Sequence, residues 1–189
     1  MSDTTRRSYA VGALASVAAF VLTYVLVYAM SIATVQDALL TNIAESFGDG
    51  RAAWKIVGWE FFNAQFVTTT ITVAIPFLGG TSAVNFIAES ESLSPVLYLL
   101  PPAVLTAAGI GTARIDGATD VGRAVRVGPA VVLGYLPLAV LGAVLFTVSA
   151  GESGQGAPTL LTAVALAGVV YPAVFGAVGA TLAATVGDS

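Results

Sequence analysis

Residues 9–34 read YAVGALASVAAFVLTYVLVYAMSIAT and contain no charged side chain. A membrane hydrocarbon core about 30 Å thick is crossed by about 20 mostly apolar residues in an α-helix. This run is long enough to cross such a core. It is also longer than the apolar part of a cleaved signal peptide, which has about 7–15 residues. It therefore predicts a membrane-spanning helix.

The composition extends this interpretation to the whole chain. Of the 189 residues, 57% are hydrophobic and 10% are charged, and the mean hydropathy is +0.89. A soluble domain carries about 25% charged residues, so this chain has too few charges to cover a surface in water. The absence of cysteine and histidine excludes disulfides, thiol catalysis, histidine-based triads and zinc sites. We expect a non-enzymatic membrane protein without catalytic residues, metal or cofactor.

Five apolar runs predict the architecture. The predicted spans are residues 9–34, 59–78, 94–112, 125–149 and 159–186. They lack the alternation of polar and apolar residues that a membrane barrel requires, so all of them are expected to be helices. Residues 35–47 (VQDALLTNIAESF) place their apolar side chains on one stripe, which indicates a short amphipathic helix on the membrane surface. The sequence thus predicts a single all-α membrane domain over residues 1–189.

The second predicted span opens with a set of residues typical of a membrane interface. Residues 54–72 read WKIVGWEFFNAQFVTTTIT. Trp54, Lys55 and Trp59 predict an interfacial anchor, because indole rings favour headgroup depth and a lysine can extend its ammonium group toward water.

Polar side chains follow this anchor. On a helix, Glu60, Asn63 and Thr70 share one sector, and Gln65 lies in the neighbouring sector. A carboxylate within the membrane is costly and marks a functional site by default. This favours a proton or cation site at Glu60 with Asn63 and Thr70 as oxygen ligands. The alternative is structural, because Glu60 lies near the interface, where it can pair with Lys55 or stay hydrated. Asn, Gln and Thr also commonly form interhelical hydrogen bonds.

Proline interrupts each of the last three predicted spans, and a tyrosine precedes each interruption. The prolines are Pro101, Pro102, Pro137 and Pro172, and the tyrosines are Tyr98, Tyr135 and Tyr171. Such breaks place helix ends at midplane sites in transporters. Because residues 94–112, 127–150 and 159–187 hold no charged residue, we interpret the breaks mainly as kinks that shape packing.

Small residues recur at four-residue spacing along the last predicted span, among them Gly168, Gly176 and Ala180. A face of this kind lets another helix approach closely. We therefore expect these residues at a helix–helix contact, either within the chain or with another subunit.

The charged residues leave the orientation contested. Two arginines precede the first span, whereas five of the seven basic residues follow the first and third spans. With five spans, the positive-inside rule favours a cytoplasmic C-terminus, although the first helix argues the other way. Residues 84–92 (VNFIAESES) are expected to form an acidic loop with one helical turn, and residues 151–158 (GESGQGAP) to form turns.

The balance of charges also bears on the source and the partners. Eleven acidic residues outnumber seven basic ones, and Lys55 is the single lysine. This bias favours a salt-adapted organism, because surface carboxylates stay hydrated in strong salt. No clustered positive charge is present for nucleic acid.

Three runs carry a resemblance to a known family. They are AAWKIVGWEFFNAQFV (52–67), LPPAVLTAAG (100–109) and GVVYPAVFGAVG (168–179). They resemble a family of small multi-pass membrane proteins from haloarchaea, some of which are loosely labelled transporters. The resemblance spans nearly the whole chain and implies a cytoplasmic-membrane protein, but no reaction and no site residues. It also implies that titration at Gln65 is not essential here, because a histidine often occupies that position in the family.

Two functions remain open from the sequence. The first is a non-enzymatic membrane subunit or scaffold that contacts the lipid bilayer and other membrane subunits or further copies of itself. The alternative is a small transporter or channel that uses the polar face of the second helix. A water-filled cavity at Glu60 would favour the alternative, and a position at headgroup level beside Lys55 would count against it.

Overall fold

The computed structural model describes residues 3–38, 52–74, 79–117, 122, 127–149 and 154–186. Helix α1 (Asp3–Ala38) contains the first predicted span and continues through residues 35–38. The rest of the predicted surface helix over residues 35–47 lies outside the described residues.

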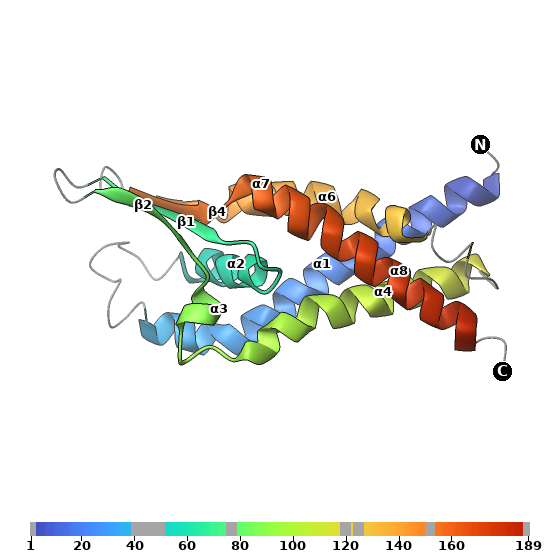
Figure 1. Ribbon diagram of the computed structural model, residues 1–189, viewed down its shortest axis with the longest axis horizontal. Helices are drawn as coiled ribbons and strands as arrows, with labels where there is room; N and C mark the ends of the chain where they lie inside the picture. The colour runs from blue at the N-terminus through green and yellow to red at the C-terminus, as the bar shows by residue number, and fades with distance from the viewer. Residues whose placement is uncertain are drawn as a thin grey trace.

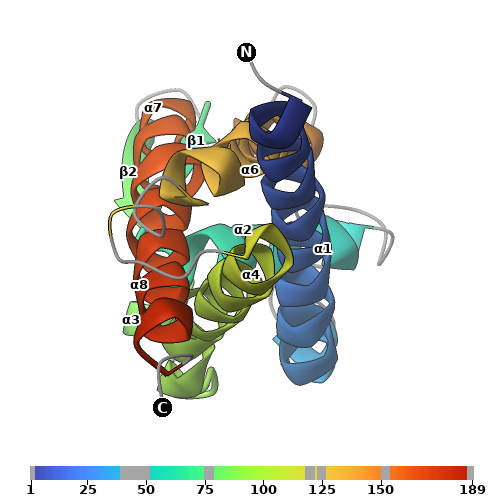
Figure 2. The ribbon, with the colours of Figure 1, turned by 90° about the vertical axis from the view of Figure 1, so that its right-hand side faces the viewer.

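Four long helical segments form the body of the molecule (Figure 1). They are α1; α4 (Leu100–Asp116), which follows the 3₁₀ helix η3 (Pro95–Leu99); α6 (Val127–Leu145); and a C-terminal segment made of α7 (Leu160–Thr162), the π-helix η5 (Ala163–Val170) and α8 (Tyr171–Val186). Figure 2, a view along the bundle, shows them around a common axis. Helices α4 and α6 each contact both α1 and α8. The two chain ends lie at the same end of the bundle (Figure 1).

Three of these segments are long and apolar enough to cross a membrane, judged by length and composition. They are Tyr9–Asp37, Pro95–Asp116 and Leu160–Val186, and α6 contains a shorter apolar helix at Ala130–Leu145. Large apolar side chains point outward from them, such as Leu14, Leu141 and Leu161, which are 71%, 62% and 79% exposed. Helices that are apolar all round suit a lipid environment, so these segments are compatible with a membrane protein.

A small antiparallel sheet projects from the end of the bundle opposite the termini (Figure 1). Its strands are β1 (Thr69–Val73), β2 (Gly80–Val84), β3 (Val148–Ser149) and β4 (Gly154–Pro158), in the order β2-β1-β4-β3. Thr69 of β1 lies opposite both Val84 and Pro158. The all-α prediction is therefore wrong. The turns predicted at residues 151–158 are also wrong where β4 forms, whereas α3 (Phe86–Glu89) supplies the helical turn expected in the acidic loop.

The predicted span over residues 59–78 is not a helix along its length. Helix α2 (Ala53–Asn63) ends before the midpoint of that range, and β1 follows it. The run of threonines explains the change, because β-branched side chains are restricted in a helix and fit a pleated strand. An 11-residue helix is about 16 Å long, too short to cross a bilayer. Five membrane-spanning helices are thus not found in the described part of the chain.

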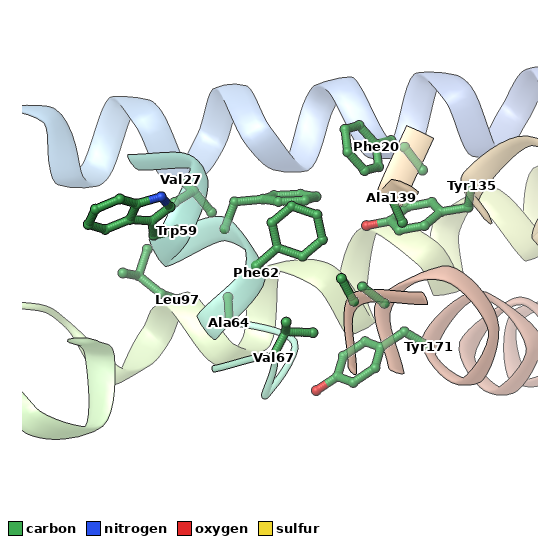
Figure 3. Close-up of a cluster of buried hydrophobic side chains, with 14 of the residues drawn as sticks. Phe20, Val27, Trp59, Phe62, Ala64, Val67, Leu97, Tyr135, Ala139 and Tyr171 are labelled. Atoms are coloured by element: carbon green, nitrogen blue, oxygen red, sulfur yellow. The ribbon is translucent and has the colours of Figure 1, made fainter. Parts of the chain in front are cut away.

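Instead, the α2–β1 hairpin (residues 53–73) enters the bundle from the sheet end and turns back. The Phe61 ring lies 4.8 Å from the Phe20 ring, and Phe20 lies 5.0 Å from Tyr135. Phe20 and Tyr135 are near the middle of α1 and α6. Figure 3 shows Phe62, Ala64 and Val67 of the hairpin among side chains of the surrounding helices. The core of the molecule therefore forms around the tip of the hairpin.

Candidate functional site

Helix α2 is enclosed on almost every side, and the candidate site is built around it. Nine of its 11 residues are buried. The backbone of α2 can approach the Phe146 ring closely because Gly58 has no side chain. A Cβ at this position would lie 2.5 Å from ring atoms of Phe146. In the same way, a Cβ on Gly156 of β4 would lie 2.6 Å from the Trp59 ring. A helix with apolar side chains on most of its surface must be covered in this manner.

The predicted interfacial anchor divides into a core residue and a surface pair. Trp59 is 3% exposed, its Nε1 donates to the Phe146 carbonyl at 2.7 Å, and its ring stacks on Phe86. It is therefore a core residue, contrary to the prediction. Lys55 Nζ donates to the Thr147 carbonyl at 2.8 Å and lies 5.6 Å from the Trp54 ring centre. Trp54 is 38% exposed, so it remains at the surface with Lys55.

Asn63 holds the turn that follows α2. Its Nδ2 donates to the Val67 carbonyl at 2.8 Å and to Thr69 Oγ1 at 3.2 Å, and its Oδ1 accepts from the Phe86 N–H at 2.8 Å. These bonds satisfy backbone groups at a helix end, where intrahelical partners run out. Asn63 therefore joins the hairpin to α3. Because both the nitrogen and the oxygen of its side-chain amide are hydrogen-bonded, Asn63 is not an available ligand beside Glu60.

The same turn contains an unusual backbone conformation at Phe66. Its φ of 57° is left-handed, which costs roughly 1–2 kcal/mol for a residue with a side chain. The ring is 59% exposed but stacks on Tyr98 with centres 4.8 Å apart. Tyr98 in turn donates its hydroxyl to Asn85 Oδ1 at 3.0 Å. The ring stacking thus helps to hold the strained turn against η3.

Gln65 connects the tip of the hairpin to α6. Its side chain is fully buried, its Nε2 donates to the Phe61 carbonyl at 3.2 Å, and its Oε1 accepts from the Tyr135 hydroxyl at 3.1 Å. Because Tyr135 is also fully buried, this bond takes place away from water, where an unmade partner is costly.

Thr70 is on a strand and does not share a helical sector with Glu60. Its Oγ1 lies 2.7 Å from Thr159 Oγ1, and Thr68 Oγ1 lies 3.3 Å from the same atom. These hydroxyls connect the hairpin to the residue that precedes α7. The predicted ligand set of Glu60, Asn63 and Thr70 is therefore not assembled, because the chain turns between Asn63 and Thr70.

Glu60 lies between α2 and α1. The residue is 3% exposed, and neither its Oε2 nor the fully buried Ser31 Oγ of α1 has a hydrogen-bond partner among the described residues. Burial raises the pKa of Glu60 to about 7. The Ser31 hydroxyl is close enough to lower the pKa partly, but the two groups do not meet in hydrogen-bond geometry. Glu60 is thus buried within the protein, at the contact between α1 and α2.

The prolines take three different positions. Pro101 and Pro102 lie in the first turn of α4, so they do not interrupt that helix, in contrast to the predicted break. Proline is tolerated there because the first N–H groups of a helix have no intrahelical partner. Pro137 lies inside α6, which continues through it, and Pro172 is the second residue of α8, with Tyr171 between it and the π-helix η5. Tyr171, which precedes Pro172, packs against Phe175 with ring centres 5.3 Å apart. Tyr98 and Tyr135 contact the hairpin, through Phe66 and Gln65.

The small residues of the last segment contact other helices of the same chain. Gly176 lies against α6: if it carried a Cβ atom, that atom would be 3.2 Å from the Val131 side chain. Its backbone lies against Gly109 of α4. Gly168 faces Leu136, and Ala180 is fully buried. A second close contact, between Gly134 of α6 and the Ala13 backbone of α1, was not predicted, although Ser8, Gly12 and Ser16 recur there at the same four-residue spacing.

Comparison with known proteins gives one match. A family of unknown function (DUF7978) matches residues 1–187. No curated protein and no solved structure matches the chain. Within the described residues, no group of three Asp or Glu side chains could hold a metal ion.

Proposed function

We propose, for a chain that belongs to the DUF7978 family, the role of a non-enzymatic membrane subunit that anchors a small extramembrane sheet. The observation that carries this proposal is the sheet itself, which extends past the ends of α6 and of the C-terminal segment that begins with α7 (Figure 1). In its outer strand β2, the residues from Gly80 to Ala83 are exposed. Strand β1 lies at the centre of the sheet, and β2 has no neighbour on its other side among the described strands.

The packing of the bundle supports a structural role. The hairpin fills the end of the bundle near the sheet with buried aromatic rings. The side-chain amides of Asn63 and Gln65 form hydrogen bonds within the protein. Near the other end, Gly109 and Gly179 bring the backbones of α4 and α8 together. Close contacts between small residues are the usual means of helix association in lipid.

The proposed orientation is supported by the distribution of basic residues along the chain. Arg6 and Arg7 of α1 and Arg114 of α4 lie at the end with the termini, and Lys55 of α2 lies toward the end with the sheet. In the sequence, Arg123 and Arg126 fall between α4 and α6, and Arg51 falls between α1 and α2. The positive-inside rule then places both termini in the cytoplasm and the sheet outside. The conflict between the first helix and the later loops disappears, because a re-entrant hairpin replaces one span.

The proposed setting is the cytoplasmic membrane of a salt-adapted, haloarchaeal cell. The chain has 11 acidic and seven basic residues and one lysine, and an acidic surface stays hydrated in strong salt.

The orientation is tested by thiol labelling, which is simple because the chain has no cysteine. We expect Ser82→Cys on β2 to react with a membrane-impermeant maleimide in intact cells. Thr185→Cys near the C-terminus should react after permeabilisation alone. The reverse pattern would place the sheet in the cytoplasm.

The partner of the sheet is proposed to be a β-strand of another membrane subunit, because an open strand edge offers unpaired backbone groups for strand addition. A photo-crosslinking amino acid at Ser82 should give one discrete product in native membranes. Ala83→Lys should remove it, because an edge lysine opposes strand addition. A matched probe at Leu141, which is 62% exposed on α6, should not give that product. A product unaffected by Ala83→Lys contradicts the proposal.

The alternative function, a small transporter or channel, is favoured by the buried carboxyl group of Glu60, because such groups in membrane proteins often serve proton or ion movement. Reconstituted vesicles test it. Proton or cation flux that is lost in Glu60→Gln would favour the transporter, and the absence of flux in the unmodified protein would favour the scaffold.

A further inference from the structure

Two buried oxygen atoms at the contact between α1 and α2 have no hydrogen-bond partner among the described residues. They are Oε2 of Glu60 and Oγ of Ser31. The other polar side chains nearby are engaged: Thr23 donates to the Ala19 carbonyl, and Lys55 donates to the Thr147 carbonyl. Buried polar groups in native proteins are nearly always hydrogen-bonded, so an unpaired couple requires an explanation.

The chemistry of this pair fits a proton better than a metal ion. Calcium takes about six to eight oxygen ligands, and magnesium needs a near-octahedral set, whereas this contact offers two unpartnered oxygens. A single hydrogen atom on the carboxyl group can satisfy both atoms, because a protonated carboxyl group donates and a serine hydroxyl accepts.

No counter-charge on the elements packed against α2 replaces the proton. The titratable or charged groups in the half of α1 that holds Ser31 are Tyr24, Tyr28 and Asp37, and α2 and α3 add Lys55 and Glu89. Tyr135 of α6 contacts the hairpin at Gln65. Tyr24 donates its hydroxyl to the Trp54 carbonyl, and Tyr135 donates to Gln65. The influences on the Glu60 carboxyl group are burial first and the Ser31 hydroxyl second.

We propose that Glu60 and Ser31 form a proton-binding site that locks the α2–β1 hairpin into the bundle. In the locked state the Glu60 carboxyl group is neutral, and a rotation of the Ser31 or Glu60 side chain from the position in the structure lets its O–H donate to Ser31 Oγ. Release of the proton to water leaves a carboxylate buried beside α1 without a cation, and desolvation then favours movement of α2 toward water.

The hairpin couples this site to the centre of the bundle. Glu60 lies in the last turn of α2, next to the turn that contains Gln65. Movement of α2 therefore strains the bond between Gln65 and Tyr135, which holds the hairpin to α6. Ala64, fully buried at the end of α2, should become accessible when the hairpin loosens.

Cysteine accessibility measures this opening in the otherwise cysteine-free full chain. The rate of maleimide labelling of Ala64→Cys is divided at each pH by that of Ser82→Cys, which corrects for thiol ionisation. With the pKa of Glu60 at about 7, the deprotonated fraction, and with it the corrected rate, should rise about ten-fold between pH 6 and pH 8. Adding Glu60→Gln should abolish this rise, and adding Glu89→Gln, an exposed acid, should preserve it.

A second measurement does not depend on the cysteine variants. The infrared carbonyl stretch of a protonated carboxyl group should be present at pH 6, decline by pH 8 and be missing in Glu60→Gln. A rise in labelling that persists in Glu60→Gln overturns the lock. A carboxyl band that is identical in Glu60→Gln and the unmodified protein overturns the proton site itself.

Discussion

Replacing Gly109 by alanine should separate α4 from α8. The Cβ of an alanine would lie 2.9 Å from the carbonyl carbon of Gly176, and closer still to its oxygen, whereas ordinary contacts are 3.4–4 Å. Both neighbours are backbone atoms, so no side chain can rotate away. The helices must move apart by roughly 0.5–1 Å, and overpacking of this kind costs about 1–3 kcal/mol.

Gly111 provides the matched control in the same helix. A Cβ there meets nothing within 4 Å, so Gly111→Ala should leave stability unchanged or raise it by up to about 1 kcal/mol through helix propensity. Denaturant titration in micelles, followed by the fluorescence of Trp54 and Trp59, measures the difference. Equal shifts for the two variants would refute the assignment of Gly109 to a backbone contact.

Three further results are expected. Tyr135→Phe should lower the free energy of unfolding by about 1–3 kcal/mol, because Gln65 Oε1 loses its buried donor. If adding Gln65→Leu to Tyr135→Phe restored no stability in thermal unfolding, this explanation would be contradicted. Phe66→Gly should be more stable than Phe66→Ala by about 1 kcal/mol, since glycine accepts the left-handed backbone; equal midpoints in denaturant argue against strain. The raised pKa of Glu60 means that the folded protein binds the proton more tightly than the unfolded chain does. The free energy of unfolding should therefore fall as the pH rises from about 4.5 to about 7. A Glu60→Gln variant with the same dependence of stability on pH would exclude Glu60 as the cause.

The long helices could be predicted because length and apolar character decide them together. Residues 9–34 and 159–186 have no polar pattern that competes with a helix, and both are helical in the structure. Segments 59–78 and 151–158 were harder, because their structure depends on partners distant in sequence. The strand GQGAP at residues 154–158 exists because β1 pairs with it and because Gly156 makes room for Trp59.

The site was predicted in part. Glu60 was identified because a carboxyl group in an apolar run is conspicuous, but its neighbour Ser31 carries no signal of its own in the sequence. The assignment of Trp59 to the interface failed because an indole ring suits both a headgroup region and a protein core. Its burial follows from contacts with Phe86 and Phe146, which lie 27 and 87 residues further along the chain.

The pairing of β1 with β4 also constrains biosynthesis. Thr69 lies opposite Pro158, so the central strand gains its second neighbour after most of the polypeptide has left the ribosome. Until then, the hairpin has β2 beside it but lacks β4 and the hydroxyl of Thr159. Final seating of the hairpin is therefore a late, post-insertion event, and truncation before residue 154 should yield helices that enter the membrane without completing the fold.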